Sequence, residues 1–214
     1  MTELTFYGYW RATAPYRVRI GLALKGLAYD YAPVNLAAGD QRHEEYLRRN
    51  PQGLTPLLVH GEQAMSQSLS ILEWLEEACP EPPILPVDPA GRQAVRAMAG
   101  VIACDIHPLN NLRVLQQLTA LGVDEAGRQA WISRWMAEGF AALEPMVARH
   151  GQGYAYGATP TLADCCLVPQ AYSADRFGVD LGPYPAVRAA VETARAHPAF
   201  QAAHPDRQAD APAA

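Results

Sequence analysis

The sequence has almost no lysine and no excess of positive charge. Of the seventeen basic residues among 214, sixteen are arginine, and Lys25 is the only lysine. The formal net charge of −5 argues against binding nucleic acid or an anionic membrane through bulk charge. No apolar run approaches the ~18 residues that a membrane-spanning helix needs. Residues 1–4 lack the basic and apolar regions of a secretory signal, so we expect a cytoplasmic protein.

Cysteine is also scarce, and its spacing does not suit a metal centre. The four cysteines form no C-x-x-C pair and have no histidine at the distance typical of zinc ligands. Cys165 and Cys166 are neighbours, which is a poor geometry for a disulfide between them. The sequence therefore predicts reduced, partly buried thiols and no metal site.

Alanine is rare in the first part of the chain and abundant in the second. Residues 1–89 contain 9 alanines and residues 90–214 contain 29, and alanine is the best helix former. Five prolines fall between residues 80 and 89, which is typical of a semi-rigid linker. We expect an α/β domain at 1–80, a linker at 81–89, an all-helical domain at 90–203 and a loosely ordered tail at 204–214.

Periodicity predicts the elements within these parts. The first domain shows strand 4–7, helix 15–25 capped by Gly26, and strand 29–34, which is the span of a parallel β-α-β unit. A short helix at 43–49, a hairpin of strands 56–60 and 63–65, and helix 68–79 follow. In the second domain helical patterns cover 90–118, 124–149, 161–176 and 184–196, and Thr161 with Asp164 resembles a capping box.

Three positions in the first domain suit the binding of an anionic, peptide-like ligand. Thr13 lies at the start of a helix, whose N–H groups stabilise an anion such as a thiolate, although Thr13 also suits a simple N-cap. A cis Thr55–Pro56 bond would leave the Thr55 backbone free to pair with a peptide. Gln67 and Ser68 precede another helix, where Ser68 suits either a carboxylate site or an ordinary cap. An α/β domain places such loops near one end of its sheet.

Residues 1–80 resemble the thioredoxin-like domain of glutathione transferases. The whole chain resembles their zeta class, which includes maleylacetoacetate and maleylpyruvate isomerases. The blocks that carry the resemblance are residues 17–26, 50–56, 67–77, 105–111, 161–170 and 176–185. The resemblance implies the glutathione transferase fold, a thioredoxin-like domain followed by a helical-bundle domain, and it implies a homodimer.

The resemblance also implies glutathione as cofactor and assigns residues to it. Gln67 and Ser68 would bind its γ-glutamyl end, and Thr55, before a cis-proline at Pro56, would hold its cysteinyl backbone. Further glutathione contacts are implied at Gln52 and Asn111.

One departure from the family pattern concerns the thiol site. The family usually carries Ser-Ser-Cys before the first helix, whereas this chain has Ala12-Thr13-Ala14. Thr13 would then be the catalytic hydroxyl donor to the thiolate. Alternatively, the helix N-terminus alone would stabilise the thiolate.

The implied reaction is the isomerisation of a cis double bond in a small dicarboxylate keto acid, in which the glutathione thiolate adds, the new single bond rotates, and elimination follows. Arg11, Arg113 and Arg176 are the candidates to bind the carboxylates, with Arg11 and Arg176 also stabilising charge in catalysis. Each arginine also suits a surface position or a domain-interface pair. Pro108 is expected to bend its helix. Asp105 is expected either to reach a partner subunit's glutathione or to be a buried structural carboxylate.

The leading hypothesis is a maleylacetoacetate isomerase of tyrosine and phenylalanine catabolism. A maleylpyruvate isomerase of gentisate degradation is a close alternative. A general glutathione transferase acting on small electrophilic acids and a non-catalytic glutathione-binding protein also remain open, the latter because of Ala12 and Ala14.

Overall fold

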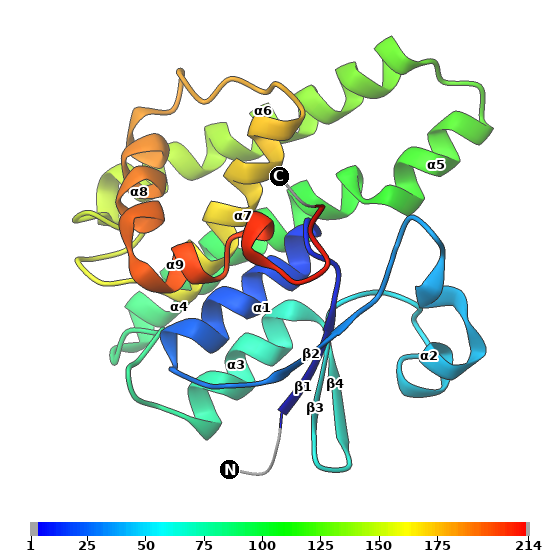
Figure 1. Cartoon of the computed structure of the whole chain (residues 1–214). Coiled ribbons are helices and arrows are strands. Elements are labelled where there is room, and N and C mark those ends of the chain that lie inside the picture. The colour runs from blue at the N-terminus through cyan, green and yellow to red at the C-terminus, as the bar shows by residue number, and fades with distance from the viewer. Residues whose placement is uncertain (1–3, 213–214) are drawn as a thin grey trace. The chain divides into compact units, whose positions relative to one another are not determined.

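The computed structural model describes residues 4–212 and divides into two compact units (Figure 1). The first unit is Met1–Pro83 with His197–Ala214, and the second is Ile84–Ala196. The division at Pro83 falls inside the predicted linker. Residues 1–3, on which the expected lack of a secretory signal depends, and the last two residues of the predicted tail lie outside the described part.

The first unit contains a four-stranded sheet in the order β2-β1-β3-β4. Strand β1 (Leu4–Gly8) pairs in parallel with β2 (Asp30–Pro33) and antiparallel with β3 (Leu57–His60), which forms a hairpin with β4 (Gln63–Ser66). The helices of this unit are α1 (Thr13–Leu24), α2 (Glu44–Arg49) and α3 (Ser68–Ala78). A 3-10 turn at Asp40–Arg42 precedes α2. The predicted β-α-β unit, hairpin and following helix are confirmed.

Helices α1 and α3 cover one face of this sheet and α2 lies on the other (Figure 1). The alternation of β1 explains the two cores, because Phe6 is fully buried on one face while Tyr7 packs with Tyr46 of α2 on the other. Gly21 lets α1 approach α3 closely, since a Cβ there would collide with the Leu72 side chain. Gly26 has φ +65° and supplies the predicted left-handed end of α1.

The C-terminal segment belongs to the first unit rather than to the helical one. Helix α9 (Pro198–Ala202) packs against α1, and a 3-10 turn at Pro205–Arg207 follows. The sequence placed 197–203 in the second domain and predicted a loosely ordered tail, whereas the chain is structured as far as Pro212. The reason is a pair of hydrogen bonds between side chain and backbone: Arg19 Nε donates to the Ala203 carbonyl at 3.1 Å, and the Trp10 N–H donates to Asp210 Oδ2 at 3.0 Å.

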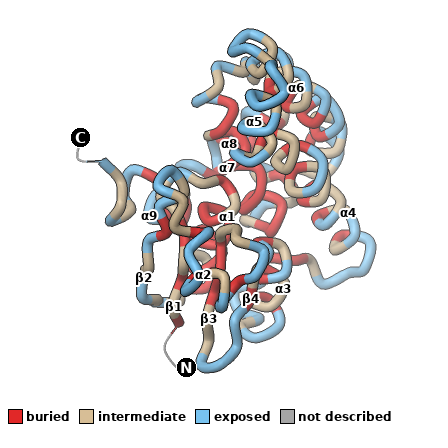
Figure 2. The backbone as a smooth tube through the Cα atoms, turned by 90° about the vertical axis from the view of Figure 1, so that its right-hand side faces the viewer, coloured by how far each residue is buried: buried red, intermediate tan, exposed pale blue. Residues whose placement is uncertain are grey.

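The second unit is all-helical, as predicted. Its helices are α4 (Pro89–Gly100), α5 (Leu112–Ala120), α6 (Glu125–His150), α7 (Leu162–Arg176) and α8 (Pro185–Ala196). Helix α7 is almost entirely buried (Figure 2). Its capping box is confirmed: Asp164 accepts hydrogen bonds from the Thr161 N–H and hydroxyl, both at 2.8 Å.

The predicted continuous helix at 90–118 is wrong. After α4 the chain forms a π-helical segment (Val101–Ile106) and a 3-10 turn (His107–Asn110), and α5 begins anew after its cap, Asn111. Pro108 lacks the N–H that a continuing helix needs, and the Asn111 side chain accepts from the Arg113 N–H at 3.2 Å. A proline and a capping asparagine so close together end one helix and start another.

Within residues 4–212, no helix combines the length and the apolar character needed to cross a lipid bilayer.

Candidate functional site

The strand register gathers three of the expected binding segments at one end of the sheet. Tyr7 of β1 is paired with Leu57 of β3, and Leu57 is paired with Ser66 of β4. The turn that follows β1, the Thr55–Pro56 bond before β3 and Gln67–Ser68 after β4 therefore leave the sheet at this same end. The expectation that these loops lie together is confirmed, while their roles in binding remain predictions.

The turn between β1 and α1 presents a helix N-terminus without a side-chain cap. The N-cap is Ala12, so the alternative that Thr13 is the N-cap is wrong. Thr13 is instead the first helical residue, with 6% of its surface exposed. The N–H groups of a first helical turn have no intrahelical partner, and no side-chain cap is made here. The turn therefore suits an anion, with the Thr13 side chain beside it.

Gln67 has an unusual backbone and connects two of the expected glutathione contacts. It is the only non-glycine residue of the described part with a positive φ, at φ 70° and ψ 111°. Its side-chain Nε2 donates to Gln52 Oε1 at 2.7 Å. Strained backbone of this kind persists where the surroundings require it and clusters at binding sites. Ser68, the first residue of α3, is 5% exposed, and no side chain caps α3.

Arg17 makes a contact that the sequence did not predict. Its guanidinium is buried and donates from Nη1 to the Ser68 hydroxyl at 3.2 Å. This contact places a positive charge behind a residue expected to bind a carboxylate. Arg17 follows Thr13 by four residues, so both side chains lie on the same face of α1. This four-residue spacing was the one sequence feature that could have placed Arg17 near the expected site.

The segment that presents Gln52 is held by buried polar groups. Asn50 Nδ2 and the Tyr46 hydroxyl both donate to the Leu54 carbonyl at 2.7 Å, and Asn50 Oδ1 accepts from the Gln52 N–H at 3.3 Å. Burial raises the pKa of Tyr46 to about 12. Gly53 adopts φ +62°, which a side chain would strain. Asn50 and Tyr46 position the loop; the turn sequence 50–53 indicated a turn but not these bonds.

The bond between Thr55 and Pro56 is cis, as the resemblance to glutathione transferases implied. Thr55 is half-buried and Pro56 is buried at the start of β3. Whether the Thr55 backbone pairs with a ligand remains a prediction.

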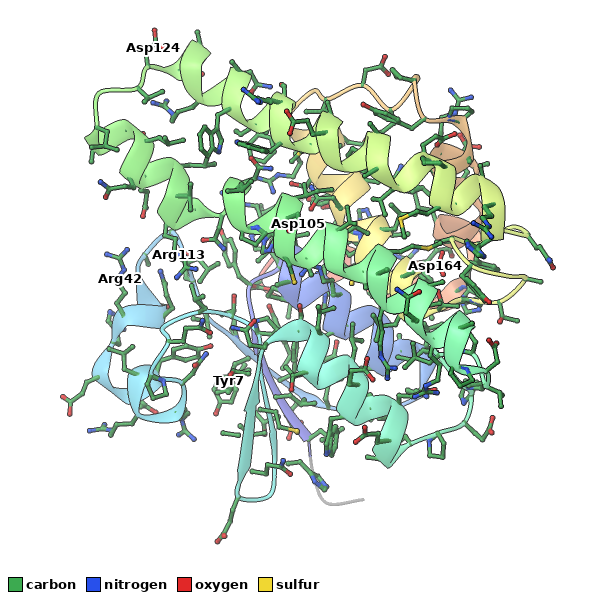
Figure 3. All side chains as sticks on the ribbon, turned by 180° about the vertical axis from the view of Figure 1, so that it is seen from behind. Tyr7, Arg42, Asp105, Arg113, Asp124 and Asp164 are labelled. Carbon is green, nitrogen blue, oxygen red and sulfur yellow. The ribbon has the colours of Figure 1, made fainter. Side chains whose placement is uncertain are left out.

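The three candidate arginines are all exposed. Arg11, in the first unit, lies over the rings of Trp10 and Tyr9, with its Cζ 5.5 and 5.9 Å from their centroids. In the second unit Arg113 projects from the first turn of α5 (Figure 3). Arg176, at the end of α7, has its Cζ 5.2 Å from the Phe177 ring centroid. Their convergence on one substrate remains a prediction.

Two further predicted positions lie in the second unit. Asn111 caps α5 through its Oδ1, so that atom has a structural role, and its contact with glutathione remains a prediction. Asp105 is exposed in the π-helical segment (Figure 3). The alternative of a buried structural carboxylate is therefore wrong. Across residues 4–212, no group of three or more His, Cys, Asp or Glu could hold a metal ion.

Both units match known families. Residues 14–78 match the glutathione S-transferase N-terminal domain, and residues 129–193 match the glutathione S-transferase C-terminal domain. The maleylacetoacetate isomerase of Pseudomonas aeruginosa is 47% identical over 99% of this chain and 100% of its own length. The chain belongs to the glutathione S-transferase family.

Solved structures give the same result. A maleylpyruvate isomerase described as a bacterial zeta-class glutathione S-transferase superposes with a TM-score of 0.95, at 45% identity, over 97% of this chain and 100% of that one. A maleylacetoacetate isomerase from Anaeromyxobacter dehalogenans, with dicarboxyethyl glutathione and citrate bound in its active site, has a TM-score of 0.89 at 44% identity and 100% coverage of both chains. The resemblance to the zeta class is confirmed.

Proposed function

We propose that the protein is a glutathione-dependent cis–trans isomerase of maleylacetoacetate. The observation that carries this proposal is the hydrogen-bonded pair Gln52 and Gln67, with Ser68 beside it, at the sheet end from which the Thr13 turn also leaves. The full-length similarity to the maleylacetoacetate isomerase of Pseudomonas aeruginosa supports the substrate.

The residues at this sheet end fit glutathione by their chemistry. The exposed Gln67 amide and the Ser68 hydroxyl at an uncapped helix N-terminus suit the α-carboxylate of a γ-glutamyl group. The buried Arg17 adds positive charge through Ser68. Thr55, before the cis bond, offers backbone groups to the cysteinyl residue. Gln52, and Asn111 through its amide nitrogen, are the remaining contacts that we assign to glutathione.

Bound glutathione supplies a thiolate that adds reversibly to the substrate's cis double bond, so that rotation and release give the trans isomer. The chain's own residues lower the cost of the charges involved. Thr13 donates its hydroxyl to the sulfur, and the α1 N-terminus stabilises its negative charge. Arg11 and Arg176 stabilise the charge that develops on the substrate, and Arg113 binds a carboxylate.

Maleylpyruvate is the second candidate substrate. The zeta-class structure with a TM-score of 0.95 is a maleylpyruvate isomerase, and both substrates carry the same cis double bond between a carbonyl and a carboxylate. We further propose that the protein acts as a homodimer in the cytoplasm, where glutathione is abundant and thiols stay reduced.

The test is a comparison of kcat/KM for maleylacetoacetate and maleylpyruvate, each with and without glutathione. We expect glutathione-dependent turnover of both and a higher kcat/KM for maleylacetoacetate. A higher kcat/KM for maleylpyruvate would make maleylpyruvate, and not maleylacetoacetate, the preferred substrate. Glutathione binding without turnover of either substrate would contradict the isomerase function. Sedimentation of the purified protein tests the dimer separately.

A further inference from the structure

The peptide groups on both sides of Trp10 are held by residues from distant parts of the chain. The Trp10 N–H donates to Asp210 Oδ2 at 3.0 Å, across 200 residues. The Trp10 carbonyl accepts from Arg19 Nη2 at 2.7 Å. Both hydrogen-bonding groups of this one residue are thus engaged, which fixes the direction in which the chain leaves β1.

Arg19 also fastens the C-terminal segment. Its guanidinium is fully buried, and its Nε donates to the Ala203 carbonyl at 3.1 Å. Burial lowers the pKa of Arg19, while Tyr31, Tyr29, Tyr16 and the Asp210 carboxylate act in the opposite direction. The Arg19 guanidinium therefore binds both the Trp10 carbonyl in the turn after β1 and the Ala203 carbonyl. Asp210 binds the same turn through the Trp10 N–H.

We call residues 203–210 the C-terminal strap. In Figure 1 this segment follows α9 and runs beside the start of α1, and its atoms reach the backbone immediately before Arg11 and three residues before Thr13. We propose, on the basis of the function proposed above, that the strap sets the geometry of the thiol site, with Asp210 as a positioning residue for the turn 9–13.

The turn 9–13 has few local contacts that fix its conformation. Residues 9–12 join a strand to a helix whose N-cap is an alanine, so no side chain of the turn caps α1. Ala12 N–H donates to the Tyr9 carbonyl at 3.1 Å, which closes the turn locally. The Trp10 peptide groups are instead fixed by Asp210 and Arg19. Loss of the Asp210 contact frees the orientation of Arg11 and of the N–H groups that face the thiolate.

The first test needs neither glutathione nor substrate. Hydrogen exchange of the turn 9–13 is measured by mass spectrometry in the full-length protein and in Asp210→Ala, Asp210→Asn and Asp206→Ala. Asp206→Ala is the matched control, because Asp206 lies in the same segment, is exposed and pairs only at 3.6 Å with His204. We expect exchange at the Trp10 amide to be about 10-fold faster in Asp210→Ala. Asp210→Asn keeps an acceptor oxygen and restores most of the protection, and Asp206→Ala changes nothing.

The second test connects the strap to the chemistry. The pKa of bound glutathione is measured from the ultraviolet absorbance of its thiolate. In Asp210→Ala this pKa rises and kcat falls about 10-fold, while the KM for glutathione stays near its original value because Gln52, Gln67 and Ser68 are untouched. A strap that only stabilises the fold would lower the melting temperature and leave the thiol pKa unchanged.

The two tests separate failure of this proposal from failure of the proposed function. If exchange at the Trp10 amide is unchanged in Asp210→Ala, or is accelerated equally in Asp206→Ala, the proposal that the strap positions the turn is wrong. This conclusion does not depend on whether the protein has isomerase activity. Faster exchange with an unchanged thiol pKa overturns its role at the thiol site. If the original protein has no isomerase activity, the exchange results and the thiol pKa still decide whether the strap positions the turn.

Discussion

The side-chain amide of Gln67 donates to the side-chain oxygen of Gln52 at 2.7 Å, joining the turn before β3 to the N-terminus of α3. This bond connects two residues that are 15 positions apart and that both belong to the expected glutathione site. Gln67 also has a positive φ of 70°, so the strained backbone lies within the expected site.

The first prediction concerns this strain. Gln67→Ala and Gln67→Gly both remove the amide and raise the Kd for glutathione about 10-fold, which is the usual loss of one or two hydrogen bonds to a charged ligand. Only glycine relieves the backbone, so Gln67→Gly is more stable to urea than Gln67→Ala by about 1 kcal/mol. Calorimetric titration and urea unfolding give the two quantities.

Gln63→Ala is the control, because Gln63 is exposed at the opposite end of β4. It leaves glutathione affinity unchanged. If Gln67→Ala and the original protein bind glutathione with equal affinity, Gln67 does not contact glutathione.

The second prediction concerns Thr13. Thr13→Val replaces the hydroxyl by a methyl group of similar size, so the pKa of bound glutathione rises and kcat falls about 10-fold. Thr13→Ser restores the hydroxyl and most of the activity. Thr119→Val, in the exposed face of α5, is the control. Unchanged kcat in Thr13→Val would mean that the N-terminus of α1 is sufficient without the hydroxyl.

The sequence predicted local structure well where the signal was local. The β-α-β unit, the hairpin and the capping box of Asp164 all depend on residues within a few positions of one another, whereas the cis bond at Pro56 was implied by the resemblance to glutathione transferases. The meeting of the three loops at one sheet end also followed, because it depends only on strand direction.

What the sequence missed depends on contacts between distant residues. The C-terminal segment is ordered by Arg19 and by Asp210, which binds the Trp10 backbone from 200 residues away, and its polar, alanine-rich composition gave no sign of this. The role of Arg17 could not be predicted because its contact with Ser68 crosses from α1 to α3. At the interruption before α5 the sequence predicted only a bend at Pro108, because the new helix start depends on the cap that Asn111 makes.

The third prediction concerns the chain's single lysine. Lys25 Nζ is buried and contacts Glu76 Oε2 at 2.8 Å and the Pro82 carbonyl at 2.7 Å. Lys25→Met removes the cation that contacts the buried Glu76 carboxylate and costs about 3–5 kcal/mol of unfolding free energy. Lys25→Met combined with Glu76→Leu recovers most of that loss. Urea unfolding measures all three proteins.

Arg48→Met tests the same change at the surface. Arg48 contacts Glu44 at 2.9 Å with both side chains exposed, so its loss costs at most about 1 kcal/mol. A loss this small in Lys25→Met would contradict the structural role of the buried pair.

The fourth prediction is a pH dependence of stability. Burial raises the pKa of Asp164 to about 6, although hydrogen bonds from Ala155 and Thr161 oppose the shift. A carboxyl group with a raised folded-state pKa contributes stability below its unfolded pKa of 3.8 and loses it as the pH rises through about 6. The loss is on the order of 3 kcal/mol.

Asp164→Asn has no titrating group at this position and serves as the reference. The stability advantage of the original protein over Asp164→Asn should shrink between about pH 3 and about pH 7, the interval that spans the unfolded and folded pKa values. An advantage that grows with pH would mean that the hydrogen bonds outweigh burial.

The central claim is that the protein isomerises its substrate through the glutathione thiol. The most direct measurement is the rate of maleylacetoacetate isomerisation with glutathione and with S-methylglutathione, which retains the γ-glutamyl and glycyl groups but has no free thiol. We predict rapid isomerisation with glutathione and none above background with S-methylglutathione. Equal rates with both, or a rate with glutathione no higher than that of glutathione alone in solution, would contradict the account.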